Sequence, residues 1–365
     1  MIQWSAVFEE IVEQAEPKRL LLAALAEGPA HAYLFHGPAG VGKQKTALAF
    51  AGELLGDRGR AERRAHPDLY VLEPLGDQIR IDEIRTLRRD LHMRPFEATL
   101  RVYVIVSAHM LNAEAADALL KDLEEPPDYA VIVLLADELG PLPETIRSRC
   151  QLISFSRLSE RAVRAVVDAW APGLAPERAT AVARVAGGRL DRAERLLDPD
   201  AAVRRDDLLE IARAVYTDPA FSAGAAAARV LELVNDGAAE AKERVDRELE
   251  WLGLTEREAD LRRRRAELGA QREGVLEALE ELAAWYRDLI CVAAGAEGVV
   301  AHYDHLPRLA EDASAERIAA AERAAELVRE TWRGFEELNL QPRLALEALF
   351  VQLRRELATS APASV

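Results

Sequence analysis

Residues 34–46 read LFHGPAGVGKQKT, and this stretch decides the fold. An apolar run of strand length at residues 32–35 leads into it, and an Ala- and Leu-rich helical pattern follows from residue 46 to 54. The glycines between them have the spacing of a phosphate-binding loop, in which backbone N–H groups and a helix N-terminus surround an anion. We therefore predict a nucleotide-binding loop; a glycine turn without a ligand is the alternative. The predicted binding residues are Gly37, Pro38, Gly40, Val41, Gly42, Lys43 and Gln44.

Three positions argue against a complete magnesium site at this loop. Nucleotide-hydrolysing loops place Ser or Thr after the lysine, and this sequence has Gln44. Thr46 is no substitute, because two residues along a helix turn the side chain by about 200°. The strand pattern RVYVIV ends at Val106 and Ser107, where phosphate-loop ATPases carry Asp and Glu. We expect weak binding of ATP or ADP without hydrolysis, and no metal site.

Composition narrows the class of protein. A chain of 365 residues predicts two or three domains, and few aromatic residues (5%) with abundant Ala, Leu, Arg and Glu favour helices. The formal net charge of −16 is unlike that of a protein that binds DNA on its own. Cys150 and Cys291 are too few for a disulfide framework or a four-cysteine zinc site, so we expect no zinc and a reducing cytoplasm. No signal segment or membrane span is expected.

The first part of the chain alternates between strand and helix patterns. Short apolar runs predict strands at 32–35, 69–72, 101–106, 129–135 and 152–155, and the run at 101–106 is rich in β-branched residues. This alternation predicts a mainly parallel sheet covered by helices on both faces. The spacing of Trp4, Val7, Phe8, Ile11 and Val12 predicts an N-terminal helix. A loop is expected at 56–65, and a helix with Asp82 as its N-cap.

From residue 158 onward the pattern is helical, with a linker expected at 198–200. A heptad repeat of apolar residues then runs through a strongly charged stretch. Its members are Leu254, Leu261, Leu268, Val275, Leu282 and Leu289. One thin apolar seam on a charged rod predicts a protruding helix, or a coiled-coil hairpin with the preceding helix, at about 236–274. Arg262–Arg265 are mixed with Glu, which favours a solvated face over a DNA-binding patch.

Several segments together carry a family resemblance. Residues 112–127 read NAEAADALLKDLEEPP, residues 143–150 read PETIRSRC, and residues 339–349 read NLQPRLALEAL. With His66-Pro67-Asp68, they resemble the delta-prime subunits of bacterial DNA polymerase III clamp loaders, in the AAA+ superfamily. Glu13 stands where that family usually has Gly, and the four-cysteine zinc module of many relatives is missing from residues 56–65. The charged rod resembles an insertion of actinobacterial-type relatives.

The resemblance implies an architecture and a role. It implies an AAA+ P-loop α/β domain at 1–157, a helical lid at 158–199 and an all-α collar at 200–365, with the insertion at about 236–274. The subunit would act as a stator in ATP-dependent loading of the sliding clamp on primed DNA during replication. Arg149, in Ser148-Arg149-Cys150, would be an arginine finger that acts in trans on the ATP of a neighbouring subunit. An Arg suits this task because its planar, permanently charged fork matches phosphate oxygens.

The same resemblance implies partners. They are the motor and delta-type subunits of a hetero-pentameric ring, the sliding clamp and, indirectly, primed DNA. The ring would be part of a DNA polymerase (nucleotidyltransferase) holoenzyme. Its location would be the bacterial cytoplasm, at the nucleoid. No membrane contact is implied. Two alternatives stay open: an active ATPase motor subunit of the same assembly, and a non-replicative AAA+ scaffold. Arg189 and Arg192 lie in the region of a second nucleotide sensor, but neither is assigned that role.

Overall fold

The computed structural model describes residues 7–74, 78–249, 255–338 and 340–358. The chain forms two compact units, and each is described by itself. The first, called here the α/β unit, comprises Met1–Val163 and Gly187–Arg192, and the second, the helical unit, comprises Arg164–Ala186 and Ala193–Val365. The three-domain division at residues 157 and 199 stays a prediction. Trp4 and Leu254, used in the sequence argument, lie outside the described residues.

Five parallel strands form the sheet of the α/β unit, as the sequence predicts. They are β1 (Ala32–His36), β2 (Leu69–Leu72), β3 (Arg101–Ile105), β4 (Ala130–Ala136) and β5 (Gln151–Ser154). Their spatial order is β2-β3-β4-β1-β5, and Leu34 of β1 lies in register with Leu134 of β4 and Leu152 of β5. Strand β1, which lies between β4 and β5, therefore brings its carboxyl end, and the loop after it, to one edge of the sheet.

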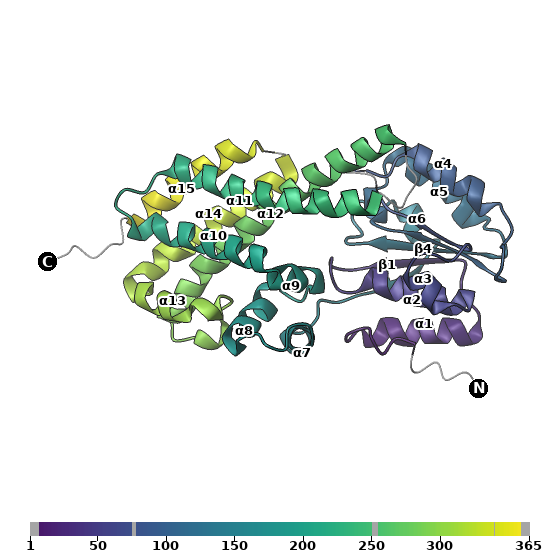
Figure 1. The fold of residues 1–365 in the computed structure, drawn as a ribbon, viewed down its shortest axis with the longest axis horizontal. Coiled ribbons are helices and arrows are strands. Elements are labelled where there is room, and N and C mark those ends of the chain that lie inside the picture. The colour runs from purple at the N-terminus through teal and green to yellow at the C-terminus, as the bar shows by residue number, and fades with distance from the viewer. Residues whose placement is uncertain (1–6, 75–77, 250–254, 339, 359–365) are drawn as a thin grey trace. The chain divides into compact units, whose positions relative to one another are not determined.

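Helices cover both faces of this sheet (Figure 1). The unit contains α1 (Ala15–Glu27), α2 (Lys43–Leu55), α3 (Arg58–Glu62), α4 (Ile81–Leu91), the 3₁₀ turn η2 (Ala108–Met110), α5 (Ala113–Glu124) and α6 (Glu144–Arg147). On one face, Leu21 of α1 and Phe50 of α2 pack with Val133 of β4. On the other, α4 and α5 pack on Leu134 of the same strand. Alternate residues of a buried parallel strand thus pack into the cores on opposite faces of the sheet. For this reason these strands are apolar at nearly every position.

The expected helix at the N-terminus is wrong for the residues that can be seen. Residues 7–10 form a turn, although Val7, Phe8 and Ile11 are buried as their apolar pattern predicted. Glu13 and Gln14, which both have a φ of 53°, separate this turn from the helix that follows, because that conformation does not continue a right-handed helix. The helix begins after them, at α1.

Two further local predictions need correction. The expected loop at 56–65 contains α3, whose N-cap Asp57 accepts a hydrogen bond from the backbone N–H of Arg60. Helix α4 begins at Ile81, and its N-cap is Arg80 rather than Asp82. The backbone N–H of Arg80 donates to the Glu83 carboxylate at 2.8 Å, so a side chain three residues into the helix caps it.

The rest of the chain is helical. It contains α7 (Glu160–Trp170), α8 (Pro176–Val185), α9 (Leu190–Leu197), α10 (Pro199–Thr217), α11 (Ala223–Leu249), α12 (Glu256–Ala293), η3 (Glu297–Val299), η4 (Tyr303–His305), α13 (Leu306–Asp312), η5 (Ala315–Arg317), α14 (Ile318–Leu338) and α15 (Pro342–Ala358). Helices α7 and α9 each have residues in both units. The linker expected at 198–200 is instead the start of α10, with Asp198 as N-cap. No helix in the described ranges is long and apolar enough to cross a membrane.

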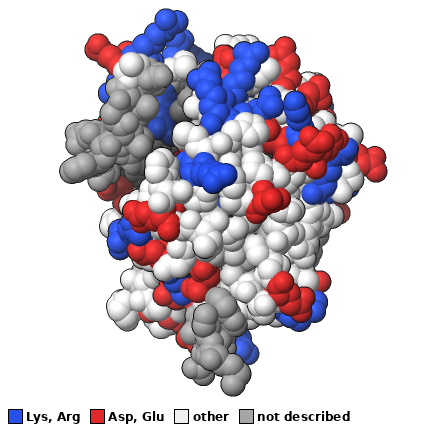
Figure 2. Space-filling model, turned by 90° about the vertical axis from the view of Figure 1, so that its right-hand side faces the viewer, with Lys and Arg blue, Asp and Glu red and all other residues white. Residues whose placement is uncertain are grey.

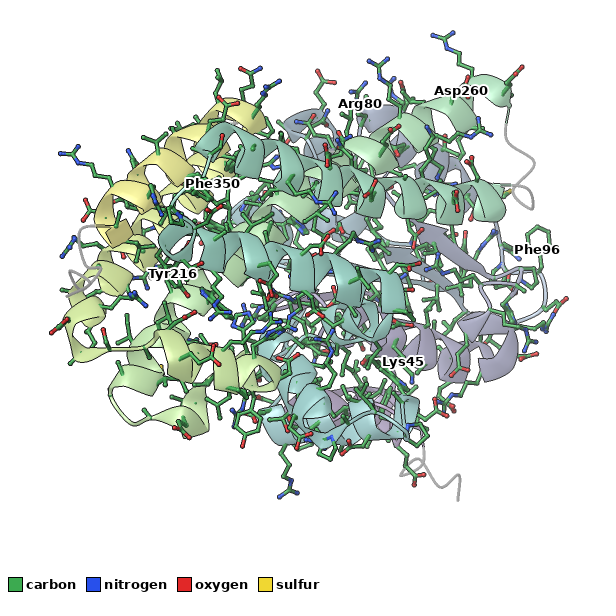
Figure 3. The ribbon with its side chains drawn as sticks, turned by 60° about the vertical axis from the view of Figure 1, so that its left-hand side comes forward. Lys45, Arg80, Phe96, Tyr216, Asp260 and Phe350 are labelled. Atoms are coloured by element: carbon green, nitrogen blue, oxygen red, sulfur yellow. The ribbon has the colours of Figure 1, made fainter. Side chains whose placement is uncertain are left out.

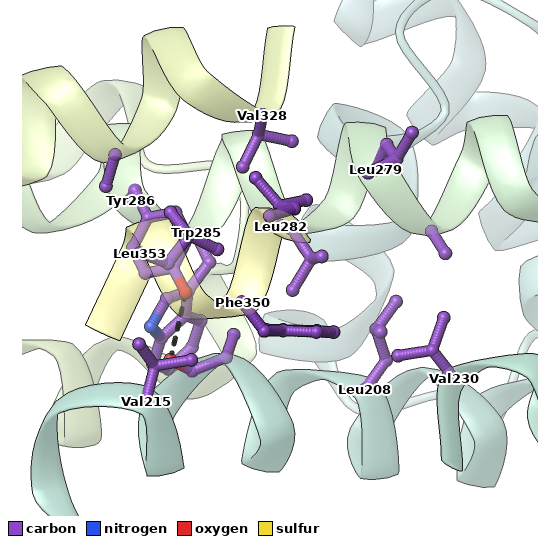
Figure 4. Packing of buried hydrophobic residues seen from close by; sticks show 14 of the residues in the cluster. Leu208, Val215, Val230, Leu279, Leu282, Trp285, Tyr286, Val328, Phe350 and Leu353 are labelled. Carbon is purple, nitrogen blue, oxygen red and sulfur yellow. Dashed lines mark hydrogen bonds between the residues drawn. The ribbon is translucent and has the colours of Figure 1, made fainter. Parts of the chain in front are cut away.

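One large core holds the helical unit together. Leu282, Trp285 and Tyr286 of α12 pack with Phe350 of α15 and Val328 of α14 (Figure 4). The Trp285 Nε1–H donates to the hydroxyl of Tyr216 at 3.1 Å, so the polar edge of this buried indole has a partner. Leu279 and Tyr286, which follow Gly274 in α12, thus belong to a helical core.

Helices α11 and α12 pair as an antiparallel hairpin. Lys242 pairs with Glu267 at 3.3 Å, and the Gln271 amide donates to Asn235 at 3.1 Å. Leu261 and Leu268 of the heptad repeat, however, are 44% and 57% exposed, whereas Leu282 is fully buried. Leu261 and Leu268 therefore do not form a buried seam between the two helices, as the heptad repeat predicted. Small residues such as Ala238 and Ala259 are buried in this part of the hairpin instead.

Candidate phosphate loop and surface arginine

The phosphate loop runs from the end of β1 to the start of α2, the strand–loop–helix context that its sequence requires. Gly37, Gly40 and Gly42 all have positive φ angles, of 135°, 69° and 97°. A Cβ on Gly37 would lie 2.1 Å from the Phe155 carbonyl oxygen, and one on Gly40 would lie 1.7 Å from a carboxylate oxygen of Asp191. The first two glycines are thus needed both for backbone shape and for close approach of neighbouring groups.

Lys43 is bound to oxygens of its own unit. Its Nζ donates to the carbonyl oxygens of Gly37 at 2.6 Å and Pro38 at 2.5 Å, and forms an ion pair with Asp137 at 2.8 Å. The side chain is buried, and this burial lowers the pKa of Lys43, although Asp137 acts in the opposite direction. A phosphate at this loop has to take the ammonium group away from these three oxygens.

The position that should ligate magnesium is engaged elsewhere. The Gln44 amide donates to the Glu73 carboxylate at 3.1 Å, and Glu73 also pairs with Arg64 at 2.8 Å. The Thr46 hydroxyl donates to the Gly42 carbonyl at 2.8 Å, within its own helix, as the geometry of the sequence indicated. These side chains fit a phosphate held by backbone N–H groups, but they do not fit a magnesium ion.

Three carboxylates that the sequence argument missed surround the loop. Asp137 follows β4, Glu73 follows β2, and Asp191 belongs to the segment Gly187–Arg192. The first two could have been found from topology, because polar residues directly after parallel strands gather at the carboxyl edge of a sheet. Val106 and Ser107 follow β3 at the same edge, and neither carries a carboxylate. No group of three or more His, Cys, Asp or Glu that could hold a metal occurs among the described residues.

The segment Gly187–Arg192 contacts the phosphate loop within the α/β unit. The Leu190 N–H donates to the Gly40 carbonyl at 2.8 Å, and the Arg189 guanidinium pairs with Asp191 at 2.8 Å. Asp191 also acts on Lys43 electrostatically, raising its pKa against the larger effect of burial. The region that the sequence singled out for a nucleotide sensor therefore brings a carboxylate to the loop. Roles for Arg189 and Arg192 remain unassigned.

His66-Pro67-Asp68 organises a surface loop. The buried Asp68 carboxylate accepts the backbone N–H groups of Phe96 at 2.6 Å, Glu97 at 2.8 Å and Ala98 at 2.9 Å. The Phe96 ring at this loop is 68% exposed (Figure 3). This segment of the resemblance is thus a structural anchor for the approach to β3.

Glu13, where the resembled family usually has Gly, adopts a left-handed conformation with a φ of 53°. Its carboxylate accepts hydrogen bonds from the Ser159 hydroxyl at 2.6 Å and from the Ser159 backbone N–H at 2.9 Å. These two bonds lower the pKa of Glu13. The next residue, Gln14, donates to the Ser156 carbonyl at 2.7 Å. The side chains of these residues hold a backbone shape that glycine would adopt without strain.

Arg149 lies on the surface just after α6. Its Nη1 donates to the Thr145 carbonyl at 2.8 Å, and its Nη2 forms a close ion pair with Glu124 at the end of α5. The side chain remains 33% exposed. Neighbouring Cys150 is largely buried, which raises the pKa of its thiol to about 12. The structure thus brings together the two most specific segments of the resemblance, 112–127 and 143–150.

Comparisons with known proteins cover the same part of the chain. A family model described as DNA polymerase III, delta subunit, matches residues 14–159. The delta-prime subunits of Bacillus subtilis and Pseudomonas aeruginosa DNA polymerase III are 34% identical over 145 residues and 38% identical over 136 residues. Over this part, the chain is similar to clamp-loader subunits of DNA polymerase III.

Other clamp-loader relatives extend the match. The Bacillus subtilis DNA polymerase III subunit tau is 31% identical over 233 residues. The matched stretches make up 59%, 36% and 33% of this chain for tau and the two delta-prime subunits, and 41%, 44% and 42% of those proteins. The chain therefore spans less than half the length of these relatives. A DNA polymerase III gamma subunit-related protein from Thermotoga maritima shares the fold, with 17% identity, a TM-score of 0.50, and 94% and 99% of the two chains covered.

Proposed function

We propose that this chain is a clamp-loader subunit of a bacterial DNA polymerase III holoenzyme, a stator that does not hydrolyse ATP itself. In the ring it supplies Arg149 to the ATP of a neighbouring motor subunit while the sliding clamp is loaded on primed DNA. The observation that carries the proposal is the pairing of an incomplete nucleotide loop with a surface arginine, in a chain similar to clamp-loader subunits. Gln44, Val106 and Ser107 replace the magnesium and water-activating groups, whereas Arg149 retains a charged fork.

The geometry supports a role in trans over a role in cis. Lys43 is engaged by Asp137 and by two loop carbonyls, and Gln44 is engaged by Glu73. Loss of the metal-binding and water-positioning groups removes several kcal/mol of transition-state stabilisation, which corresponds to orders of magnitude in rate. Arg149, at a surface of the unit, can contribute to a site that a neighbour completes.

The charge distribution supports shared contact with DNA. On the face shown in Figure 2, acidic and basic side chains are interspersed around a broad area without charged side chains. With a net charge of −16, the chain has no surplus of cations to neutralise phosphates by itself. DNA is therefore contacted within the assembly, and the proposal places the chain with the replication machinery in the bacterial cytoplasm.

Three measurements on this chain test the proposal. The isolated protein should hydrolyse ATP no faster than a Lys43→Ala control, and it should bind ADP weakly in a way that magnesium hardly changes. It should also co-purify with motor and delta-type subunits of a DNA polymerase III clamp loader. Steady turnover that Lys43→Ala abolishes would establish the motor subunit instead. Failure to assemble with clamp-loader subunits would favour a non-replicative scaffold.

A further inference from the structure

Glu124 is the carboxylate that contacts Arg149, and it comes from a separate element. It is the last residue of α5, whereas Arg149 follows α6, 25 residues further along the chain. The pair joins Arg149 Nη2 to Glu124 Oε1, and both side chains are partly exposed, by 33% and 49%. Proximity in sequence therefore does not explain this contact.

The end of α5 is firmly fixed in the α/β unit. Leu123 is buried in the core, and the buried Asp122 forms an ion pair with Arg88 of α4 at 2.7 Å. Burial raises the pKa of Asp122, and Arg88 acts against this by favouring the charged form. Pro126 and Pro127 then prevent the helix from continuing. Glu124 thus projects from a rigid point toward Arg149.

The guanidinium is held along one side and keeps donors for another ligand. Nη1 donates to the Thr145 carbonyl and lies 3.5 Å from the Ser148 hydroxyl, and Nη2 contacts Glu124. An arginine has five N–H donors in a fixed planar fork, so these contacts leave capacity for phosphate oxygens. A long side chain that is already oriented loses less conformational freedom when it meets its target.

We propose that Glu124 is the positioning residue for Arg149: it orients the guanidinium for the ATP of the neighbouring subunit. The inference rests on the proposed function of Arg149 in trans. The alternative is that Glu124 inhibits Arg149. A carboxylate that competes with phosphate for the arginine would slow the reaction. The backbone contact of Nη1 with Thr145 favours positioning, since it holds the fork in the same orientation as Glu124 does.

The test is a double-mutant cycle in the reconstituted clamp loader. DNA- and clamp-stimulated ATP turnover is measured for wild type, Glu124→Ala, Arg149→Ala and the double variant. Glu124→Gln serves as the conservative variant, because its amide oxygen still accepts the hydrogen bond. Glu125→Ala is the matched control, since this adjacent exposed glutamate carries the same charge. Urea unfolding of each free subunit verifies that the fold is retained.

Positioning predicts a specific pattern. In Glu124→Ala, the part of kcat that depends on Arg149 should fall about two- to fivefold, the size expected for a partly exposed ion pair. KM should not change. Glu124→Gln should lose less, Glu125→Ala nothing, and Glu124→Ala should have no effect in the Arg149→Ala background. Unchanged or faster turnover in Glu124→Ala, while Arg149→Ala remains defective, would overturn the positioning role alone. Normal turnover in Arg149→Ala would instead overturn the proposed function.

Discussion

At the scale of single residues, the phosphate loop is surrounded by carboxylates that compete with an anion. Asp137 holds Lys43 in an ion pair, and Asp191 lies against Gly40. Each negative charge both neutralises the lysine and repels phosphate. We therefore expect this loop, with all its glycines and its lysine, to bind nucleotide only weakly.

Asp191→Asn should therefore strengthen the binding of ADP. Removal of one negative charge near the loop should raise the affinity several-fold, about 1 kcal/mol at low salt, and the gain should shrink as salt screens it. Calorimetry with ADP at two ionic strengths measures both effects. Asp168→Asn, a change of the same charge on α7, is the control. An unchanged affinity in Asp191→Asn would mean that Asp191 does not oppose the nucleotide.

His302 in the helical unit gives a second residue-scale expectation. Its ring is buried between two carboxylates, with Nδ1 2.8 Å from Asp288 and Nε2 2.9 Å from Glu281. Burial acts to lower the pKa of His302, but the hydrogen bonds to these carboxylates outweigh it, so the pKa is raised. The charged imidazolium thus contributes stability that is fully present below the unfolded pKa of about 6.5 and is lost as the pH rises through the higher folded pKa.

The free energy of unfolding of this unit should accordingly decrease as the pH is raised above about 6.5. Urea unfolding followed between pH 6 and pH 9 measures the slope. His302→Gln should remove most of it, whereas His31→Gln, a change at an exposed histidine outside this unit, should retain it. A stability that rises with pH over the same range would contradict the assignment of a charged His302.

At the scale of elements, the heptad repeat of α12 changes its role along one helix. Leu261 and Leu268 are exposed on the hairpin, and Leu282 is buried in the helical core. All three are leucines, and they are separated by seven and fourteen residues, so they occupy the same heptad position. The repeat alone therefore does not decide burial, because that depends on which neighbouring elements reach each turn of the helix.

Alanine substitutions along this repeat should separate the two regions. Leu261→Ala and Leu268→Ala should each change the free energy of unfolding by less than about 1 kcal/mol, because little apolar area is buried there. Leu282→Ala should cost about 2–5 kcal/mol through the cavity that it leaves in the core. Urea unfolding of the three variants provides the comparison. A cost at Leu261 similar to that at Leu282 would show that the exposed leucines are covered in solution.

Sequence patterns predicted the regular elements better than the irregular ones. Each strand of the sheet was predicted from a short apolar run in the sequence. The short helix α3 was missed because a side-chain cap at Asp57, rather than an apolar period, defines it. The turn at Glu13 and Gln14 was missed because contacts with Ser156 and Ser159, far away in sequence, hold it.

At the scale of the whole molecule, the topology assembles a candidate site that local motifs reveal only in part. The glycine loop and Arg149 were recognisable in the sequence, since each lies within a contiguous motif. Asp137, Glu73 and Glu124 acquire their roles only when parallel strands and the α5–α6 contact bring them to those residues. The same chain also divides into an α/β unit and a helical unit.

The central claim is that Arg149 acts on a neighbour's ATP, and one measurement tests it most directly. DNA- and clamp-stimulated ATP turnover is compared for clamp loaders assembled with wild type, Arg149→Ala and Arg149→Lys. Arg85→Ala, at an exposed arginine of α4, serves as the control. An arginine finger in trans typically increases the rate at its site by roughly 10³–10⁵-fold. In Arg149→Ala, the ATP site that receives this arginine should therefore stop turning over, and total turnover should fall by the fraction which that site contributes. Arg149→Lys should be almost as defective, because a point charge does not reproduce the fork. Normal assembly with unchanged turnover and clamp loading in Arg149→Ala would contradict the account.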